Sequence, residues 1–319
     1  MHSYPRVTIG LCVKNAALTV KAAVKSILKQ DYPHKFMDVI VVDGCSQDNT
    51  LAIVKELLTK SDLSYVILRE NVGLGYARQI VVNTTKSDYI VWVDGDVILP
   101  KDHVTKQVCF MEKNPEVGIG RARYGILLGE GVVAFLENLP FVVECLKHKK
   151  IAPLEISGTE GSIYRVKAIK QVGGFDTRIT GAGEDIDIAY RIRSAGWLTC
   201  VTDAVFYEKC RGTWKSLWDG YFWWGYGGHY FFHRKKSLMY LVKMSPVGGF
   251  VGGLIRLPIA YWFTRRKVVF LLPFHYFFKR IAWFCGFIKA HIDGYGHNLP
   301  HKAICTRAAR SISRYAWKL

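Results

Sequence analysis

Residues 90–99 read IVWVDGDVIL, in which two carboxylates follow directly on a run of four apolar residues. The first four residues are typical of a buried strand. Asp94 and Asp96 come next, with only Gly95 between them. Carboxylates are seldom buried unless they are paired or hold a metal. The stretch therefore indicates a buried strand that ends at a polar site.

Further apolar segments alternate with segments of helical periodicity. The predicted strands are residues 6–13, 37–44, 64–70 and 88–96, and the predicted helices are 16–29, 50–60 and 75–85. This alternation predicts an α/β fold with a mostly parallel sheet and helices on both faces. Ligands of such sheets bind at the carboxyl ends of the strands, where Asp43, Asp94 and Asp96 are expected.

The next segments continue the pattern. We expect a helix after residue 101, a strand at 117–124, a helix at 130–148, a glycine-rich loop at 157–165 that leads into a strand, and a helix at 183–197. The last helix begins GEDID, so its first turn is acidic. These acids can complement the helix dipole, or one of them can act as a general base at a cleft edge.

Two aspartates separated by one residue can share a divalent cation. Hard oxygen ligands suit Mg²⁺ or Mn²⁺, which commonly also bind substrate phosphates. Asp94 and Asp96 are therefore candidate metal ligands, although a loop with solvated acids is the alternative. Asp43 can accept hydrogen bonds from a ribose or a base, or it can simply form a turn. In NVGLGYAR (residues 71–78), Arg78 can reach a phosphate or remain a surface residue.

These motifs together resemble glycosyltransferase family 2. VTIGLCVKN, VVDGCSQDNT, NVGLGYAR, VDGD and GGFDTRITGAGEDIDIAYRIRSAGW follow in the order and spacing of that family, over residues 5–235. The resemblance implies a GT-A (Rossmann-like) fold and inverting transfer from a nucleotide sugar. It also implies roles for the candidate residues: Val13, Asn15, Asp43, Arg78 and Asp94 bind the nucleotide sugar, Asp96 and Asp94 the metal, and Asp185 is the base with Glu184 beside it.

Three departures from the family pattern matter. Many members carry a His after the acidic pair that can assist the metal, whereas this chain offers Tyr207 and Glu208 there. The first motif reads CVKN where many members have a Tyr before the Asn, so base stacking is expected to be weaker. The Gln-x-x-Arg-Trp motif of processive members is absent, so synthesis of long polymers is not expected.

Positive charge is concentrated at the end of the chain. Residues 1–233 carry 28 Lys/Arg and 25 Asp/Glu, whereas residues 234–319 carry 16 Lys/Arg and one acid, Asp293. We therefore predict a glycosyltransferase domain at 1–233 and a basic, apolar, membrane-associating region at 234–319. A basic region binds a polyanion, either an anionic membrane or nucleic acid. The aromatic residues lie in apolar runs of membrane-like length, so nucleic acid is the less favoured partner.

Residues 244–263 and 268–288 are the apolar runs of this region. If both spanned a bilayer, the basic residues 264–267 would lie on the non-cytosolic side, against the preference of such loops. Lys279 and Arg280 would also enter the membrane. We therefore expect in-plane or re-entrant helices on an anionic, cytoplasmic membrane face, with a buried core helix as the other alternative.

The start of the chain and its cysteines favour the same compartment. No long apolar run precedes a small-residue cleavage site within residues 1–15, so we expect a cytosolic start. The eight cysteines show no CxxC pair and are expected to be reduced thiols.

The predicted activity is transfer of a sugar to a hydroxyl of a membrane-near or lipid-linked acceptor, assisted by Mg²⁺ or Mn²⁺. A polyprenyl-phosphate sugar synthase is the alternative enzyme. A nucleic-acid-binding protein that uses the basic tail is an alternative of a different class.

Overall fold

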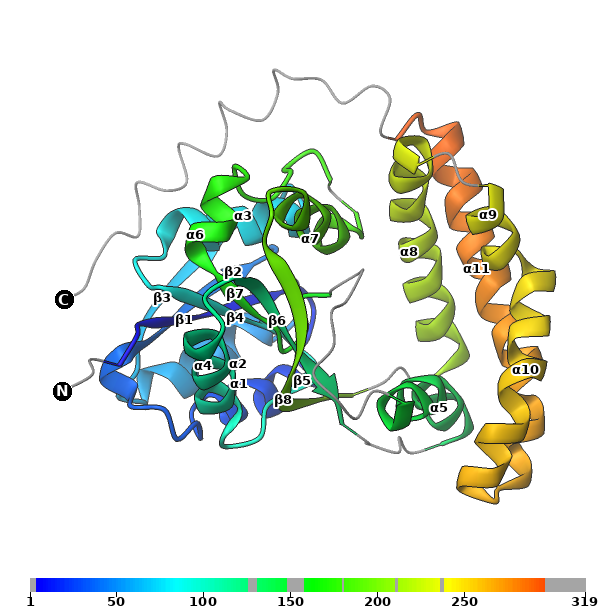
Figure 1. The fold of residues 1–319 in the computed structure, drawn as a ribbon, viewed down its shortest axis with the longest axis horizontal. Helices are drawn as coiled ribbons and strands as arrows, with labels where there is room; N and C mark the ends of the chain where they lie inside the picture. Colours follow the sequence, from blue (N-terminus) through cyan, green and yellow to red (C-terminus); the bar gives the residue numbers. More distant parts are fainter. Residues whose placement is uncertain are drawn as a thin grey trace.

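The structure is a computed structural model, and it describes residues 4–125, 131–147, 158–179, 181–209, 212–235 and 238–295. The described residues form an α/β unit and a helical unit that lie side by side (Figure 1). The α/β strands are β1 (Val7–Val13), β2 (Met37–Asp43), β3 (Ser64–Arg69), β4 (Tyr89–Asp94), β5 (Val97–Ile98), β6 (Val117–Tyr124), β7 (Ile163–Arg165) and β8 (Leu198–Glu208). The helices of this unit are α1 (Val20–Ile27), η1 (His34–Phe36), α2 (Thr50–Thr59), α3 (Leu74–Thr84), α4 (His103–Lys113), α6 (Val166–Gln171) and α7 (Glu184–Ser194).

The eight strands form one sheet in the order β3-β2-β1-β4-β7-β6-β8-β5. The half that contains β1 to β4 is parallel, as predicted. The other half is mixed, because β7 runs antiparallel to both β4 and β6, and β5 runs antiparallel to β8. The α/β fold class is confirmed, and the antiparallel strands are an addition that the helix–strand alternation did not predict.

The strand register brings the predicted acids to one edge of the sheet. Asp43 at the end of β2 pairs with Val13 at the end of β1, and Asp94 at the end of β4 pairs with Cys12. Parallel strands that are in register end together, so the segments after β1, β2 and β4 surround the same space.

Helices cover both faces of the sheet. Val24 of α1, Leu58 of α2 and Val108 of α4 belong to the apolar cluster on one face. Val81 of α3 and Ile192 of α7 belong to the cluster on the other. Each of these side chains is almost fully buried, and burial of one such side chain contributes roughly 1.5–3 kcal/mol. The predicted two-sided coverage of the sheet is therefore confirmed.

The helical unit consists of α5 (Val132–Lys147), α8 (Trp214–Lys235), α9 (Leu238–Met244), α10 (Pro246–Thr264), η2 (Lys267–Leu271) and α11 (Leu272–Ile292). In Figure 1, α8 lies nearest the α/β unit, α11 lies against α8, and α10 is outermost. Glycines bring α8 and α11 close together. A Cβ at Gly225 would lie 1.8 Å from the Trp283 carbonyl oxygen, and a Cβ at Gly286 would lie 1.9 Å from the Phe222 carbonyl oxygen.

A buried polar cluster joins α5 to this pair of helices. Glu137 of α5 accepts hydrogen bonds from the Tyr221 hydroxyl (2.8 Å), His275 Nε2 (2.9 Å) and Lys279 Nζ (3.0 Å). Burial raises the pKa of Glu137, but Lys279 and His275 outweigh burial and bring it to about 2. Removing one partner of such a buried ion pair leaves an uncompensated charge and costs roughly 3–5 kcal/mol. The cluster therefore fixes how α5, α8 and α11 pack.

Within the described residues, α10 and the segment Lys267–Ile292 are long and apolar enough to cross a membrane by length and composition. The apolar window of α10 is 17% buried, and that of Lys267–Ile292 is 44% buried. The predicted boundary between residues 233 and 234 falls inside α8, near its end. The predicted two-domain division stays a prediction.

The cysteines that the structure describes are free. They are Cys12, Cys45, Cys109, Cys200 and Cys285. The remaining three, at positions 145, 210 and 305, have side chains outside the described part. The described cysteines form no disulfide with one another, and their reduced state stays a prediction.

Candidate active site

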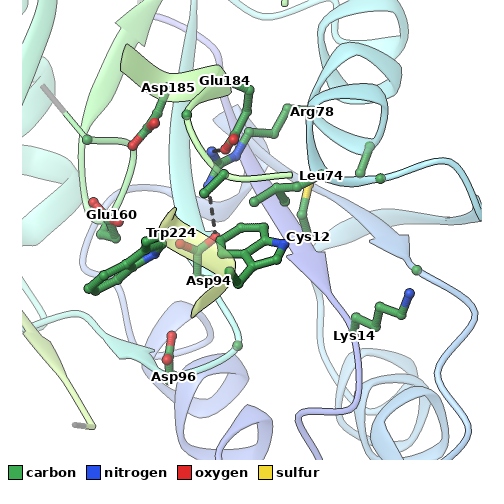
Figure 2. Close-up of a pocket in the computed structure, with 18 of the residues that line it drawn as sticks. Cys12, Lys14, Leu74, Arg78, Asp94, Asp96, Glu160, Glu184, Asp185 and Trp224 are labelled. Atoms are coloured by element: carbon green, nitrogen blue, oxygen red, sulfur yellow. Dashed lines mark hydrogen bonds and ion pairs between the residues drawn. The ribbon is translucent and has the colours of Figure 1, made fainter. Parts of the chain in front are cut away.

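A cavity of about 930 Å³ opens at the carboxyl edge of the sheet. Its walls come from the loops after β1, β2 and β4, the start of α3, the start of α7, and the inner sides of α8 and α11 (Figure 2). Seven of the eight predicted site residues line it: Val13, Asn15, Arg78, Asp94, Asp96, Glu184 and Asp185. The fold thus brings together residues that are up to 172 positions apart in the sequence.

The glycine of VDGD is required by packing. A Cβ at Gly95 would lie 2.8 Å from the Cβ of Ala16 and 3.3 Å from Val13 Cγ1. Any larger residue would push the loop after β4 away from the loop after β1. Val13 is therefore a wall residue whose side chain supports the turn between Asp94 and Asp96.

Arg78 forms ion pairs with two of the carboxylates at the pocket. Its guanidinium is buried and donates to Glu184 Oε1 and to Asp94 Oδ1, the latter at 3.3 Å. It thereby joins α3, α7 and the end of β4. The sequence predicted that Arg78 contacts the nucleotide; the described contacts are with carboxylates, and nucleotide contact stays a prediction.

Asp185 is half-buried and follows Glu184, the ion-pair partner of Arg78, at the start of α7. Ile186 N–H donates to its Oδ1 at 2.8 Å, and Oδ2 lies on the pocket side. Burial raises the pKa of Asp185, the neighbouring Glu160 raises it further, and Arg78 opposes the shift. A raised pKa in a cleft suits a group that must take up a proton.

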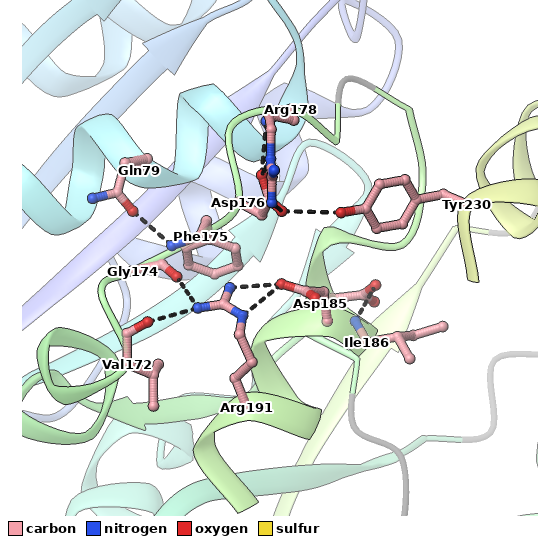
Figure 3. Close-up of polar contacts among 11 residues, drawn as sticks. Gln79, Val172, Gly174, Phe175, Asp176, Arg178, Asp185, Ile186, Arg191 and Tyr230 are labelled. Atoms are coloured by element: carbon pink, nitrogen blue, oxygen red, sulfur yellow. Dashed lines mark hydrogen bonds and ion pairs between the residues drawn. The ribbon is translucent and has the colours of Figure 1, made fainter. Parts of the chain in front are cut away.

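The third acid of GEDID has a structural role. Asp187 is fully buried and forms an ion pair with Arg191, at 2.7 Å from Nε. The Arg191 guanidinium also donates to the carbonyl oxygens of Val172 and Gly174 (Figure 3). Asp187 therefore helps to fix α7 to the loop before it. The three acids of GEDID thus lie in different surroundings: Glu184 is paired with Arg78, Asp185 faces the cavity, and Asp187 is paired with Arg191.

The loop after β1 is held in a precise shape. Asn15 has a φ of 49°, and its Oδ1 accepts from Gln47 N–H at 2.8 Å, while its own N–H donates to Ser46 Oγ at 2.9 Å.

Asp43 is fully buried and does not line the cavity. Its carboxylate accepts hydrogen bonds from Arg69 Nε at 3.1 Å and from Ser46 N–H. The flanking Val42 and Gly44 line the cavity instead. A nucleoside contact by Asp43 stays a prediction.

The carboxylate of Glu70 accepts hydrogen bonds from backbone N–H groups at the start of α3. Glu70 Oε2 accepts from Val72 N–H at 2.6 Å and from Gly73 N–H at 2.8 Å. These N–H groups belong to the NVGLGYAR segment and lie where a helix N-terminus can bind an anion. In this structure, Glu70 satisfies them and lines the cavity itself.

Asp94 and Asp96 both line the cavity, and their role as ligands of a divalent cation stays a prediction. Among the described residues, no group of three or more His, Cys, Asp or Glu forms a cage for a metal. Mg²⁺ is commonly bound by one or two protein carboxylates, and phosphate oxygens and water fill its remaining coordination positions. Of the two residues considered as additional ligands, Glu208 lines the cavity, whereas Tyr207 packs against Gly125.

The structure adds residues that the sequence did not single out. Glu160 lies in the pocket from the loop before β7, and Trp224 of α8 lines it from the helical unit (Figure 2). Arg280 of α11 also lines the cavity. Glu160 was visible inside the glycine-rich SGTEGS, a signal of close backbone approach. Trp224 and Arg280 carried no local signal, because only the packing of α8 and α11 brings them to the cavity.

The helical unit also touches the segment that precedes Asp185. Tyr230 of α8 donates to Asp176 Oδ2 at 3.0 Å (Figure 3), and Gly181 N–H donates to the Tyr295 hydroxyl at 3.1 Å. A Cβ at Gly227 would lie 2.0 Å from the Ala182 carbonyl oxygen. The position of Asp185 therefore depends on both units.

Comparison with known proteins gives a family and a fold. A family model described as "Glycosyl transferase family 2" matches residues 8–172, just over half of the chain. The poly-beta-1,6-N-acetyl-D-glucosamine synthase of Staphylococcus epidermidis is 23% identical over 224 residues, which is 69% of this chain and 53% of the relative. The enzyme of the same name from Staphylococcus aureus (strain COL) is 21% identical over 234 residues, 70% and 54% of the two chains. The chain thus spans about half the length of these curated relatives.

A solved structure is similar over most of the chain. It is the mannosyltransferase PcManGT from Pyrobaculum calidifontis, in complex with GDP-Man and Mn²⁺, with a TM-score of 0.63 and 17% identity. The similarity covers 92% of this chain and 88% of that one, so it extends from the α/β unit into the helical unit. At this level of identity the similarity shows that the fold is shared.

Proposed function

Because the chain belongs to glycosyl transferase family 2, we propose that it transfers a sugar from a nucleotide-diphosphate sugar to a hydroxyl of a membrane-near or lipid-linked acceptor, with inversion at the anomeric carbon. The observation that carries the proposal is the joint placement of Asp94, Asp96 and Asp185 in one cavity at the carboxyl edge of the sheet. Sheets of this class bind nucleotides at that edge.

The donor occupies the side of the cavity next to β1 and α3. Asn15, Gly44 and Gly73 line this side and leave room for a nucleoside and its diphosphate. Lys14 also lines it and supplies positive charge. The similarity to a mannosyltransferase that was solved with GDP-Man and Mn²⁺ supports a nucleotide-sugar donor and a divalent cation.

Asp96 and Asp94 would hold that cation. When bound, Mg²⁺ or Mn²⁺ neutralises negative charge on the diphosphate leaving group. The Arg78 guanidinium forms an ion pair with Asp94, which positions the Asp94 carboxylate and places a positive charge next to it. The salt bridge from Arg78 to Glu184 links this metal-binding end of the pocket to the start of α7.

Asp185 acts as the base. Its carboxylate accepts the proton of the acceptor hydroxyl while the oxygen forms a bond to the anomeric carbon. The bond from that carbon to the diphosphate breaks on the opposite face, and the nucleoside diphosphate leaves with the bonding electrons. One in-line displacement inverts the anomeric carbon. The raised pKa of Asp185 makes it a stronger base than a solvated aspartate.

The helical unit supports a membrane location. Apolar side chains along one stripe of α10 are exposed to solvent, among them Val247 (70%), Ile255 (69%) and Trp262 (68%). Large exposed apolar surfaces mark interaction sites. Arg265, Arg266 and Lys267 follow directly after α10 and are suited to anionic headgroups.

The geometry favours helices that lie in the membrane interface. Arg280, near the middle of α11, lines the same cavity as Asp185. If α11 crossed the bilayer from end to end, this cavity and the polar α/β unit beside it would have to enter the hydrocarbon. An in-plane arrangement buries only the exposed stripe and leaves the α/β unit in water. We place that water on the cytoplasmic side, following the basic loop after α10.

A donor screen tests the proposal. UDP, GDP, UDP-sugars and GDP-mannose are added to the protein with Mn²⁺, with Mg²⁺ or with EDTA, and the melting temperature and calorimetric affinity are measured. We expect metal-dependent stabilisation by one nucleotide series and loss of the metal dependence in Asp96→Asn. Affinity that is equal in EDTA, or unchanged in Asp96→Asn, would contradict the metal assignment.

A further inference from the structure

Glu160 is a pocket carboxylate with no role in the mechanism above. It lies on the turn formed by residues 158–162, just before β7, and lines the cavity with Asp185 (Figure 2). An ideal Cβ on Gly158 would lie 2.3 Å from Glu160 Oε2 and 3.6 Å from Asp185 Oδ2. The two carboxylates therefore approach the same small volume. Among the described residues, no hydrogen bond or ion pair involves the Glu160 side chain.

The turn that carries Glu160 is firmly anchored. Gly161 adopts a φ of +63°, and its N–H donates to the Trp92 carbonyl of β4 at 3.0 Å. Its own carbonyl accepts from His103 Nε2 at 2.9 Å and from Gln107 Nε2 at 2.7 Å. Both donors are fully buried on α4. The fold thus uses two buried polar side chains to hold Glu160 toward the cavity.

The space next to the Glu160 and Asp185 carboxylates favours ligand groups that donate hydrogen bonds. Ionised carboxylates accept hydrogen bonds and donate none. A group with two neighbouring hydroxyls can donate one to Asp185 and one to Glu160. A phosphate offers only acceptor oxygens and negative charge, so it meets repulsion from both carboxylates.

An aromatic surface adjoins these carboxylates. Trp224 of α8 lines the cavity beside Glu160 in Figure 2. Tryptophan presents a large flat apolar face with a polar edge, which suits a ring that is apolar on one face and carries hydroxyls on its rim. Sugar rings have this character, whereas a phosphate at the end of a lipid does not.

We propose that Glu160 is a specificity-determining residue, which binds the hydroxyl next to the one that Asp185 deprotonates and so selects a sugar with adjacent free hydroxyls as acceptor. The inference rests on the proposed function and deepens it, because it names the acceptor class. It also excludes a polyprenyl phosphate as the acceptor of this site.

The test uses decyl glycosides of glucose, mannose and N-acetylglucosamine, their deoxy analogues, and decyl phosphate as probes. Transfer from the donor found in the screen is measured for the wild type, Glu160→Ala, Glu160→Gln and a control, Glu56→Gln, at an exposed glutamate of α2. We expect transfer to a glycoside and none to decyl phosphate. In Glu160→Ala, the acceptor KM should rise about tenfold or more, the loss expected for one hydrogen bond to a charged group.

The deoxy analogues separate a contact from a structural effect. Removal of the adjacent hydroxyl should cost the wild type about tenfold, and it should cost Glu160→Ala less than about twofold, because the partner is already gone. Calorimetry should give the same donor affinity in both proteins. Equal deoxy penalties, transfer to decyl phosphate, or a wild type that turns over donor but glycosylates no glycoside would overturn the inference. Absence of any donor binding would instead count against the proposed function.

Discussion

At the scale of single residues, one buried arginine explains why neighbouring acids in the same motif behave differently. Arg78 is paired with Glu184 and Asp94, so Glu184 serves the structure of the pocket. Asp185 is one position further along α7 and faces the cavity. Because of this division, we propose Asp185 rather than Glu184 as the base.

Replacement of Asp185 tests the assignment. Asp185→Asn should lower kcat by roughly a hundredfold or more, because the amide cannot take up the acceptor proton. Donor affinity should stay nearly unchanged, since the backbone and the Arg78 pairs remain. Steady-state kinetics and calorimetry measure the two quantities, with Asp203→Asn, at an exposed aspartate of β8, as the matched control. Full activity in Asp185→Asn would remove Asp185 from the mechanism.

The pH dependence gives a second test of the same residue. Burial and Glu160 raise the pKa of Asp185, and the base works only in its deprotonated form. The rate should therefore be full above this raised pKa and fall as the pH drops through it, above the ordinary aspartate value of about 4. Glu160→Gln removes a negative neighbour, lowers the pKa of Asp185 and should move the acidic limb of kcat to lower pH. A limb that does not move would show that Glu160 does not act on the base.

Much of the site could be predicted residue by residue, and the limits have a physical cause. Asp94 and Asp96 were predictable because an apolar strand fixes where its polar end lies. The fully buried position of Asp43 was not, because it depends on the ion pair with Arg69 of a neighbouring strand. Arg78 shows the same limit, since its partners lie 16 and 106 positions away in the sequence.

At the scale of elements, the important contact is between α8 and the loop before α7. Gly227 brings the α8 backbone against Ala182, three residues before Asp185. The 3.6-residue and two-residue periodicities predicted the elements of the parallel half of the sheet well. The strand expected after the glycine-rich loop is present as β7, but the sequence did not predict its antiparallel direction. The packing of α8 against α11 was also not predicted, because it depends on glycine contacts between distant segments.

A single methyl group tests this contact. In Gly227→Ala the new Cβ would meet the Ala182 carbonyl oxygen at 2.0 Å, so α8 must move away from the loop. We expect a loss of roughly 1–3 kcal/mol in unfolding free energy and a lower kcat. Gly212→Ala is the control, because its Cβ has no heavy atom within 4 Å. Thermal unfolding and kinetics that match the control would show that α8 does not support the base.

At the scale of the whole molecule, an exposed apolar stripe runs along α10, the outermost helix, and the basic residues 265–267 follow at its end. The candidate pocket lies on the inner side of α8 and α11. This arrangement lets the protein rest on a membrane while α8 and α11 form one wall of the pocket. An acceptor that is attached to a lipid could then reach Asp185 without leaving the surface.

Vesicle binding tests this orientation. We expect tighter binding to vesicles with phosphatidylglycerol than to pure phosphatidylcholine, and salt should weaken the difference. Ile255→Asp on the exposed stripe should reduce binding about tenfold or more, whereas Leu18→Asp, at an even more exposed leucine (92%) of the α/β unit, should not. Equal binding by both variants would contradict a membrane role for α10.

The loop after α10 decides between in-plane and spanning helices. A cysteine placed at position 266, in a protein bound to sealed vesicles with the cytosolic face outward, should react with a membrane-impermeant thiol reagent. The native cysteines are replaced first. Protection until detergent is added would mean that the loop has crossed the membrane.

We propose inverting transfer from a nucleotide sugar as the reaction of this pocket. NMR of the product made from an α-linked donor with Mn²⁺ measures it most directly, because the one-bond C–H coupling at the anomeric carbon reports the configuration of the new glycosidic bond, and that bond does not mutarotate. We expect a β-configured product in the wild type and loss of turnover in Asp185→Asn. An α-configured product, or a wild type that turns over none of the UDP-sugars or GDP-mannose, would contradict the claim.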